Sequence, residues 1–231
     1  MCGRFHLNST PVEIANLFDL DIRDNFPPRY NVAPTQPIAV IHMNESRERQ
    51  YSLMRWGFIP SWAKGETLTR MGSKPLINAR GETVAEKPTF RHAYKRRRCL
   101  IPADGFYEWK RQGGDKQPFR IYRESGAFAF AGIWETAVDR DGGEIDTTAI
   151  LTIAAGAQIS TIHHREPVVV AHDQFNHWLT ADEGDTDAIN DLVAPAKADE
   201  WQFYAVSKDV GAVRNDGPHL IEPAKDLFAA L

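Results

Sequence analysis

The chain has 231 residues, of which 42% are hydrophobic and 25% are charged, and its net charge at pH 7 is −4. This composition excludes an intrinsically disordered protein, and the length suits a single domain, residues 1–231, with a sizeable core. The two cysteines exclude a disulfide scaffold, and no stretch approaches the roughly 18 apolar residues of a membrane span.

The first elements expected along the chain are a short helix and a long loop. Thr10 as N-cap, Pro11 at the first helical position and Glu13 as capping-box partner predict a helix that ends at Phe18. Residues 25–37 contain four prolines, which predict an extended, turn-rich loop.

Strands dominate the rest of the chain. Apolar, β-branched or aromatic runs predict them at residues 38–42, 51–56, 99–101, 105–109, 119–122, 127–134, 148–154, 167–171 and 201–206. Short helices are expected at residues 82–87, 173–179 and 185–192, and the last ~10 residues are expected to form a tail. Because the helices do not alternate regularly with strands, the pattern predicts an α+β fold with a largely antiparallel, barrel-like β core and short flanking helices.

Charge is distributed unevenly between the two halves of the chain. Residues 1–123 carry 21 Lys and Arg against 12 Asp and Glu, whereas residues 124–231 carry 6 against 19. Such an asymmetry indicates a face that binds a polyanion. The alternative, equally weighted at this point, is that both halves fold together and their charges interleave on one surface.

Cys2 is the first candidate for chemistry. Removal of Met1 would leave a cysteine with a free α-amine, so that two nucleophiles with reference pKa values of about 7.7–8.0 and 8.5 stand on adjacent carbons. An ordinary translation start is the alternative, and position alone does not distinguish the two. Residues 1–6 lack the basic and apolar segments of a signal peptide, so we expect the protein in the reducing cytoplasm.

Two further motifs place polar groups within apolar context. Asn78 and Arg80 would share one side of an extended segment, because strand side chains alternate. Glu108 lies between aromatic residues, where burial favours the protonated acid and suits general acid catalysis. A carboxylate that points outward from a strand is the alternative for Glu108.

His163 and His164 are adjacent, so only one of them can face a given site in a strand. No spacing typical of a metal site occurs, and neither a metal nor another cofactor is expected. Trp62, among loop-forming residues, and the run at 91–98, with five Lys or Arg in eight residues, are candidates for stacking and phosphate contacts with single-stranded DNA. Core packing and a solvated face are the alternatives.

Six motifs in order resemble those of the SRAP family, the SOS response-associated peptidase-like, abasic-site-processing proteins. They are MCGRF at 1–5, YNVAPT at 30–35, WGFIPSW at 56–62, INARGET at 77–83, RCLIPADGFYEW at 98–109 and IHHREP at 162–167. The resemblance continues to residue 216 and implies an α+β domain around a barrel-like core. Glu166 departs from the pattern, where an apolar or basic residue is expected, and this puts the electrostatics near His163 in question.

The resemblance implies covalent capture of abasic sites in single-stranded DNA by mature Cys2, whose amine and thiol close a thiazolidine ring on the sugar aldehyde. It implies a DNA-damage-response enzyme, with lyase and self-processing peptidase activity as further expectations, that acts as a monomer and is associated with the nucleoid when bound to DNA. An N-terminal-nucleophile cysteine peptidase or amide hydrolase is the rival function, and a non-enzymatic damage-binding module is a third.

The family's site residues carry over by motif. Asn78 would orient Cys2, Glu108 would move protons to and from the sugar oxygen, and His163 would assist ring closure or reversal. The DNA contacts implied by the resemblance are phosphate contacts by Arg4, Arg80 and Arg165, and a strand path lined by Asn31 and Trp62.

Overall fold

Five strands pair in a closed ring in the computed structural model, which describes all residues except 1, 23–25, 139–140, 184, 197–199 and 225–231. In ring order they are β10 (Glu144–Ala154), β4 (Arg49–Trp56), β3 (Pro37–Met43), β6 (Arg98–Ala103) and β9 (Phe128–Val138), and β9 pairs again with β10. The β4–β10 pairing is parallel and the other four are antiparallel. Three short strands extend this barrel: β5 (Asn78–Arg80) and β11 (Arg165–Pro167) pair with β10, and β12 (Val169–Val170) pairs with β9.

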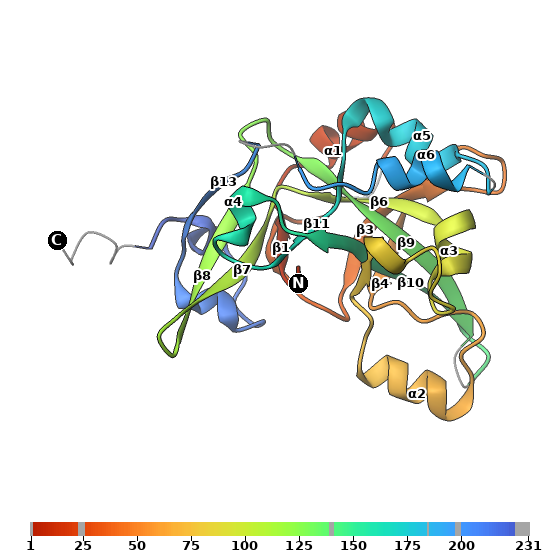
Figure 1. Cartoon of the computed structure of the whole chain (residues 1–231), viewed down its shortest axis with the longest axis horizontal. Helices are drawn as coiled ribbons and strands as arrows, with labels where there is room; N and C mark the ends of the chain where they lie inside the picture. Colours follow the sequence, from red (N-terminus) through yellow and green to blue (C-terminus); the bar gives the residue numbers. More distant parts are fainter. Residues whose placement is uncertain (1, 23–25, 139–140, 184, 197–199, 225–231) are drawn as a thin grey trace.

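A second, antiparallel sheet lies against the barrel (Figure 1). Its strand order is β13 (Gln202–Ala205), β8 (Asp115–Tyr122), β7 (Gly105–Gln112), β1 (Phe5–Leu7) and β2 (Arg29–Val32). Phe5 joins the two sheets, because its ring meets Trp56 at 5.2 Å and Phe130 at 5.9 Å between centroids. Cys2, three residues before Phe5, belongs to the same core.

Short helices surround the sheets. They are α1 (Pro11–Phe18), α2 (Gly65–Ser73), α3 (Arg91–Arg96), α4 (Ala157–Ser160), α5 (Phe175–Thr180) and α6 (Thr186–Asp191), with 3₁₀ turns η1 (Gly81–Thr83), η2 (His172–Gln174), η3 (Lys208–Gly211) and η4 (Pro218–Ile221). Within the described residues, no helix is long and apolar enough to cross a membrane.

The expected fold class is confirmed, and the capped helix is present: the Thr10 side chain and the Glu13 carboxylate form the reciprocal capping box of α1. Two element predictions are wrong. Residues 25–37 are not all loop, since they hold β2; this strand ends the second sheet, and its neighbouring prolines lie outside the ladder. The expected helix at 82–87 is a single 3₁₀ turn followed by turns that end before Pro88. Most of the expected C-terminal tail lies outside the described residues.

Candidate functional site around Cys2

Strand β1 places Cys2 beside strand β7. The two strands pair at Phe5 and Phe106, and the amide of Tyr107 donates to the carbonyl of Arg4 at 2.9 Å. The strands approach closely because Gly105 has no side chain, and a β-carbon there would collide with the His6 ring. Cys2 is consequently buried, with none of its surface exposed.

Asn78 fixes the backbone of Cys2 from the barrel side. Its strand, β5, is parallel to β10 and pairs Asn78 with Ile150. From there the Asn78 side-chain amide donates to the Cys2 carbonyl at 2.9 Å. The expectation that Asn78 reaches the cysteine is thus matched by a contact between their atoms.

Glu108 and His163 meet at the same place from two other elements. Glu108 lies on β7, His163 follows α4, and 3.8 Å separates the Glu108 Oε1 and His163 Nδ1 atoms. The carboxylate is nearly buried and the imidazole is one-fifth exposed. Burial, and then the negative charge of Glu108, raise the pKa of the Cys2 thiol well above its ordinary value. The thiol is therefore protonated at neutral pH.

The backbone of Arg165 holds the His163 ring. Its N–H donates to His163 Nδ1 at 3.1 Å, and its carbonyl oxygen lies 3.1 Å from the same nitrogen. A neutral ring accepts a hydrogen bond from the N–H, and a protonated ring donates one to the carbonyl, so the Arg165 backbone can form a hydrogen bond with either state of the ring. His164 is exposed, its ring centroid 4.3 Å from that of His163. His163 is the ring within 3.8 Å of Glu108, but the two rings lie side by side rather than on opposite faces, because residues 163 and 164 precede strand β11.

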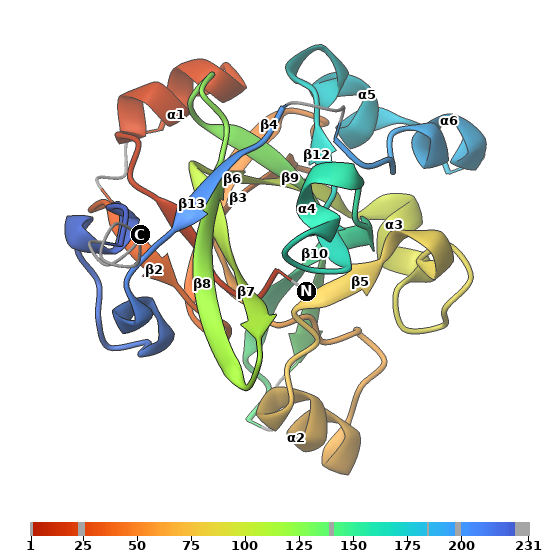
Figure 2. The same ribbon diagram turned by 60° about the vertical axis from the view of Figure 1, so that its left-hand side comes forward.

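An open hollow of about 360 Å³ adjoins the pair. Its walls include Glu108 and His163, together with Trp109, Arg111, Lys116 and Gly211. Figure 2 shows the N-terminal end of the described chain between β7, β5 and α4. Sequence reasoning missed Trp109, Arg111 and Lys116 as lining residues, although Trp109 directly follows Glu108 in the quoted motif.

Arg4 and Asn31 form one buried connection rather than two separate surface contacts. Arg4 donates to Asn31 Oδ1 at 2.7 Å and to the Val210 carbonyl at 2.7 Å. The Asn31 amide donates to the carbonyls of Val210, Ala212 and Asn215. Asn31 is 1% exposed, so it positions Arg4 and the η3 segment and has little surface to offer a ligand directly.

Arg80 and Arg165 lie on strands β5 and β11, which pair with opposite edges of β10, and they differ in how exposed their guanidinium groups are. On β10, Arg80 pairs with Thr152 and Arg165 pairs with Ala154. Arg80 is exposed. The guanidinium of Arg165 is mostly buried and forms a bidentate ion pair with Glu82.

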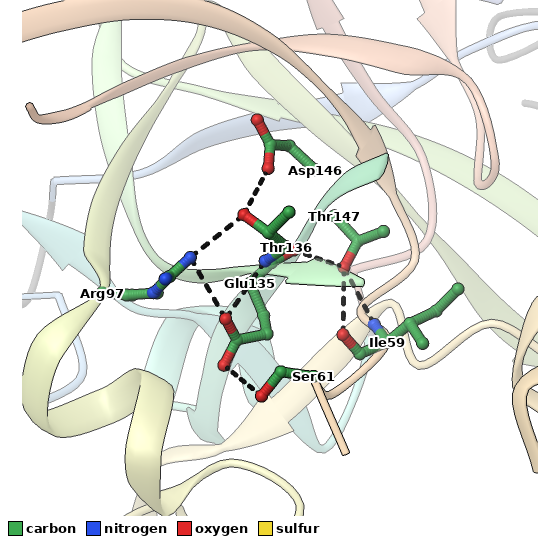
Figure 3. A network of polar contacts seen from close by, with 7 residues as sticks. All are labelled: Ile59, Ser61, Arg97, Glu135, Thr136, Asp146 and Thr147. Atoms are coloured by element: carbon green, nitrogen blue, oxygen red, sulfur yellow. Dashed lines mark hydrogen bonds and ion pairs between the residues drawn. The ribbon is translucent and has the colours of Figure 1, made fainter. Parts of the chain in front are cut away.

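Trp62 lies apart from these residues, in a hollow of about 450 Å³ lined by Ser61, His92, Arg96, Arg97, Glu135 and Thr136. Half of its side chain is exposed. Beneath it, Glu135 pairs with Arg97 at 3.1 Å and accepts a hydrogen bond from Ser61, within the polar network that Figure 3 shows. The structure therefore does not bring Trp62 into the hollow at Cys2.

The basic run at 91–98 is not one exposed surface. The expectation that the whole run contacts phosphate is wrong for Arg98. Its side chain is 4% exposed and donates to the carbonyls of Trp178, Tyr94, Lys95 and Ala181, so it cannot contact phosphate. Arg96 and Arg97 pair with acidic residues of the other half of the chain, Glu183 and Glu135. Arg47–Asp182 and Arg123–Glu200 do the same. These pairs favour interleaved charges over separate basic and acidic faces.

Glu166 lies away from His163. Its carboxylate is buried and accepts from the amides of Gly156 at 3.0 Å and Ala196 at 2.9 Å. Burial raises the pKa of Glu166 above its ordinary value. The unexpected acid therefore anchors the start of α4 and does not contact the His163 ring. Among the described residues, no group of three or more His, Cys, Asp or Glu side chains is arranged to hold a metal ion.

Comparison with known proteins matches the sequence model of one family, SOS response associated peptidase (SRAP), to residues 1–213. A relative named abasic site processing protein YoaM, from Bacillus subtilis, is 40% identical over 227 residues, covering 96% of this chain and 98% of its own. Abasic site processing protein YedK of Escherichia coli is 33% identical over 234 residues, covering 96% of this chain and all of its own.

Solved structures share the fold. A crystal structure of a protein from Bacteroides thetaiotaomicron superposes with a TM-score of 0.85 at 24% identity and covers 96% of this chain and all of that one. One from Bordetella bronchiseptica superposes with a TM-score of 0.79 at 28% identity and covers 89% of this chain and all of that one.

Proposed function

We propose that this chain, which belongs to the SRAP family, processes abasic sites in DNA by capturing them covalently on Cys2. One observation carries the proposal. Asn78 from the barrel and Glu108 from the second sheet act on Cys2, and His163 from the α4–β11 connection lies 3.8 Å from Glu108, next to an open hollow.

The chemistry follows from two nucleophiles on adjacent carbons. Once Met1 is removed, the Cys2 amine adds to the aldehyde carbon of the open abasic sugar and forms a carbinolamine. Loss of one water gives an imine, and addition of the Cys2 sulfur to the imine carbon closes the thiazolidine. The thiol proton ends on the ring nitrogen, so the whole sequence releases one water and needs no oxidant or reductant.

The residues around Cys2 divide this work. Glu108 protonates the departing hydroxyl of the carbinolamine, a step that a positioned acid accelerates by about 10²–10⁴-fold. His163 takes and returns protons while the Arg165 peptide satisfies either state of its ring. Asn78 holds the Cys2 carbonyl and so orients the amine toward the hollow.

Single-stranded DNA is the proposed partner, bound by a monomer. Arg80, Arg165 and Arg4 are the proposed phosphate contacts; Arg80 is exposed, Arg165 is paired with Glu82, and Asn31 accepts a hydrogen bond from Arg4. The exposed ring of Trp62 provides a stacking face at a distance from the lesion.

The rival function, an N-terminal-nucleophile peptidase or amide hydrolase, would need the Cys2 sulfur to attack a carbonyl first. Burial raises the pKa of the Cys2 thiol, and capture of an aldehyde begins with the amine, so its first step does not need the thiolate. Met1 removal, self-catalysed or assisted, is common to both functions.

Denaturing electrophoresis tests the proposal. Mature protein incubated with single-stranded DNA that carries one abasic site should give a heat-stable adduct, and intact DNA should give none. Cys2→Ala should abolish the heat-stable adduct, and Cys2→Ser should leave at most an unstable one. A full-strength stable adduct from Cys2→Ala would exclude the thiazolidine mechanism.

A further inference from the structure

Glu82 connects the three segments that surround His163, although no chemical step above uses it. It lies in η1, directly after the strand that carries Asn78 and Arg80. Its two carboxylate oxygens accept from the Arg165 guanidinium at 2.5 and 2.9 Å. The first oxygen also accepts from the amide of Ala154 on β10 at 3.0 Å. Arg165 lowers the pKa of Glu82 to about 2, so the carboxylate is charged at any working pH.

The Arg165 side chain is largely committed to the protein by these contacts. Besides Glu82, it donates to the Thr152 carbonyl at 2.6 Å. Its side chain is 11% exposed, against 40% for that of Glu82. A phosphate that approaches Arg165 therefore meets a guanidinium whose charge is already neutralised by a bidentate partner.

The same clamp reaches the His163 ring through the backbone of Arg165. The Arg165 backbone provides both the N–H and the carbonyl that face His163 Nδ1. Arg165 is the first residue of the short strand β11, which pairs with β10 over three residues. The neighbouring Glu166 carboxylate and the His164 carbonyl also hold this segment. The Glu82 ion pair is the anchor that acts on the Arg165 side chain itself.

We propose that Glu82 is a positioning residue: it fixes Arg165, and through the Arg165 backbone it places His163, at the expense of the attraction between Arg165 and DNA phosphates. The proposal rests on the proposed function, because its readouts are capture of an abasic site and affinity for single-stranded DNA. It predicts that loss of the Glu82 charge changes reaction rate and DNA affinity in opposite directions.

The test compares Glu82→Gln, Glu82→Asp and Glu86→Gln with the unaltered protein. Glu86 is the matched control, since it is exposed on the same segment and its substitution removes the same charge. Single-turnover adduct formation is measured at saturating abasic DNA. Equilibrium affinity is measured separately, on an oligonucleotide with a tetrahydrofuran analogue that has no aldehyde to react.

Glu82→Gln should slow adduct formation about 10-fold, less than the roughly 10²-fold that a 1 Å misplacement can cost. It should bind the analogue more tightly, with a salt slope steeper by about 0.7, the value for one more phosphate neutralised on a single strand. Glu82→Asp keeps the charge and should restore most of the rate, and Glu86→Gln should match the unaltered protein.

Two outcomes would overturn the proposal. One is a Glu82→Gln protein that reacts at the unaltered rate. The other is a parallel loss of rate, affinity and melting temperature in both Glu82 variants, which would make the residue merely structural. Failure of the unaltered protein to form any adduct would instead contradict the proposed function, so the two failures are distinguishable.

Discussion

Two hollows of the molecule contain the same kinds of side chain, a buried carboxylate, a tryptophan and cationic residues, yet they differ in how those groups are used. In the hollow at Trp62, Glu135 accepts from Arg97, Ser61 and the Thr136 amide. In the hollow at Trp109, Glu108 lies 3.8 Å from a histidine and close enough to Cys2 to raise the pKa of its thiol.

The difference separates a carboxylate that is fully engaged in structural contacts from one that we propose to transfer protons. Side-chain and backbone donors of the protein occupy both carboxylate oxygens of Glu135. Arg97 also donates to Thr136, and Thr136 donates to Asp146. This closed network fastens α3 and the Trp62 loop to β9. Glu108 instead faces two groups that can exchange protons, at the edge of an open hollow.

Replacing each carboxylate with its amide should give the largest difference in reaction rate between variants of the two hollows. Glu108→Gln keeps the shape but cannot donate the proton, so adduct formation should slow by about 10²–10⁴-fold with DNA affinity nearly intact. Glu135→Gln should leave the rate unchanged and lower the free energy of unfolding by about 1–3 kcal/mol, because Arg97 loses its charged partner. Single-turnover capture and denaturant melts check the two arms. Comparable rates in both variants would remove the distinction.

The adjacent histidines provide the next comparison. His163→Ala should change the rate of adduct formation, its reversal or strand cleavage by about 10- to 100-fold, since this ring lies 3.8 Å from Glu108. His164→Ala is the matched control, because it removes an exposed ring one residue away. If His164→Ala has the larger effect on rate, the assignment of His163 is wrong.

The two tryptophans should differ in which measured quantity they affect. Trp62→Ala should weaken single-stranded DNA binding about fivefold, the low end of what one stacked base contributes, and leave the saturated rate unchanged. Trp109→Ala should lower both quantities, since Trp109 lines the hollow that contains Glu108 and His163. Equilibrium binding beside saturated capture separates the effects, and identical profiles for both variants would contradict the comparison.

The smallest expected effect concerns salt. Arg80→Ala should reduce the salt slope of single-stranded DNA binding by about 0.7, one phosphate contact. Arg96→Ala should change it less, because Arg96 is paired with Glu183 at 2.7 Å. Titrations between 50 and 200 mM salt measure both slopes. An equal reduction in the two variants would show that the ion pair at Arg96 does not withhold its charge from DNA.

The sequence predicted elements well where a local rule governs them. The capping box at Thr10 and Glu13 and the strands expected at residues 38–42 and 51–56 need only neighbouring residues. The sequence did not predict elements that lack a local pattern or that depend on pairing with distant residues. Helix α2, which buries none of its residues completely, has little apolar pattern to detect, and β2 owes its existence to pairing with β1.

The same division holds for the site. Cys2, Asn78, Glu108 and His163 were expected from motifs, and the structure brings them together. The burial of Asn31 and Arg98 and the clamp between Glu82 and Arg165 were not foreseen. Each depends on partners 27 or more residues away in the chain, such as Ala181 for Arg98, which no local pattern encodes.

The mass of the intact adduct between the protein and abasic single-stranded DNA tests the central claim most directly. Covalent capture by the Cys2 amine and thiol predicts a mass equal to the protein without Met1 plus the DNA, less one water. The adduct should also resist borohydride reduction, because a closed thiazolidine has no imine bond. An adduct that retains Met1, or a heat-stable, borohydride-resistant adduct from Cys2→Ala, would contradict the account.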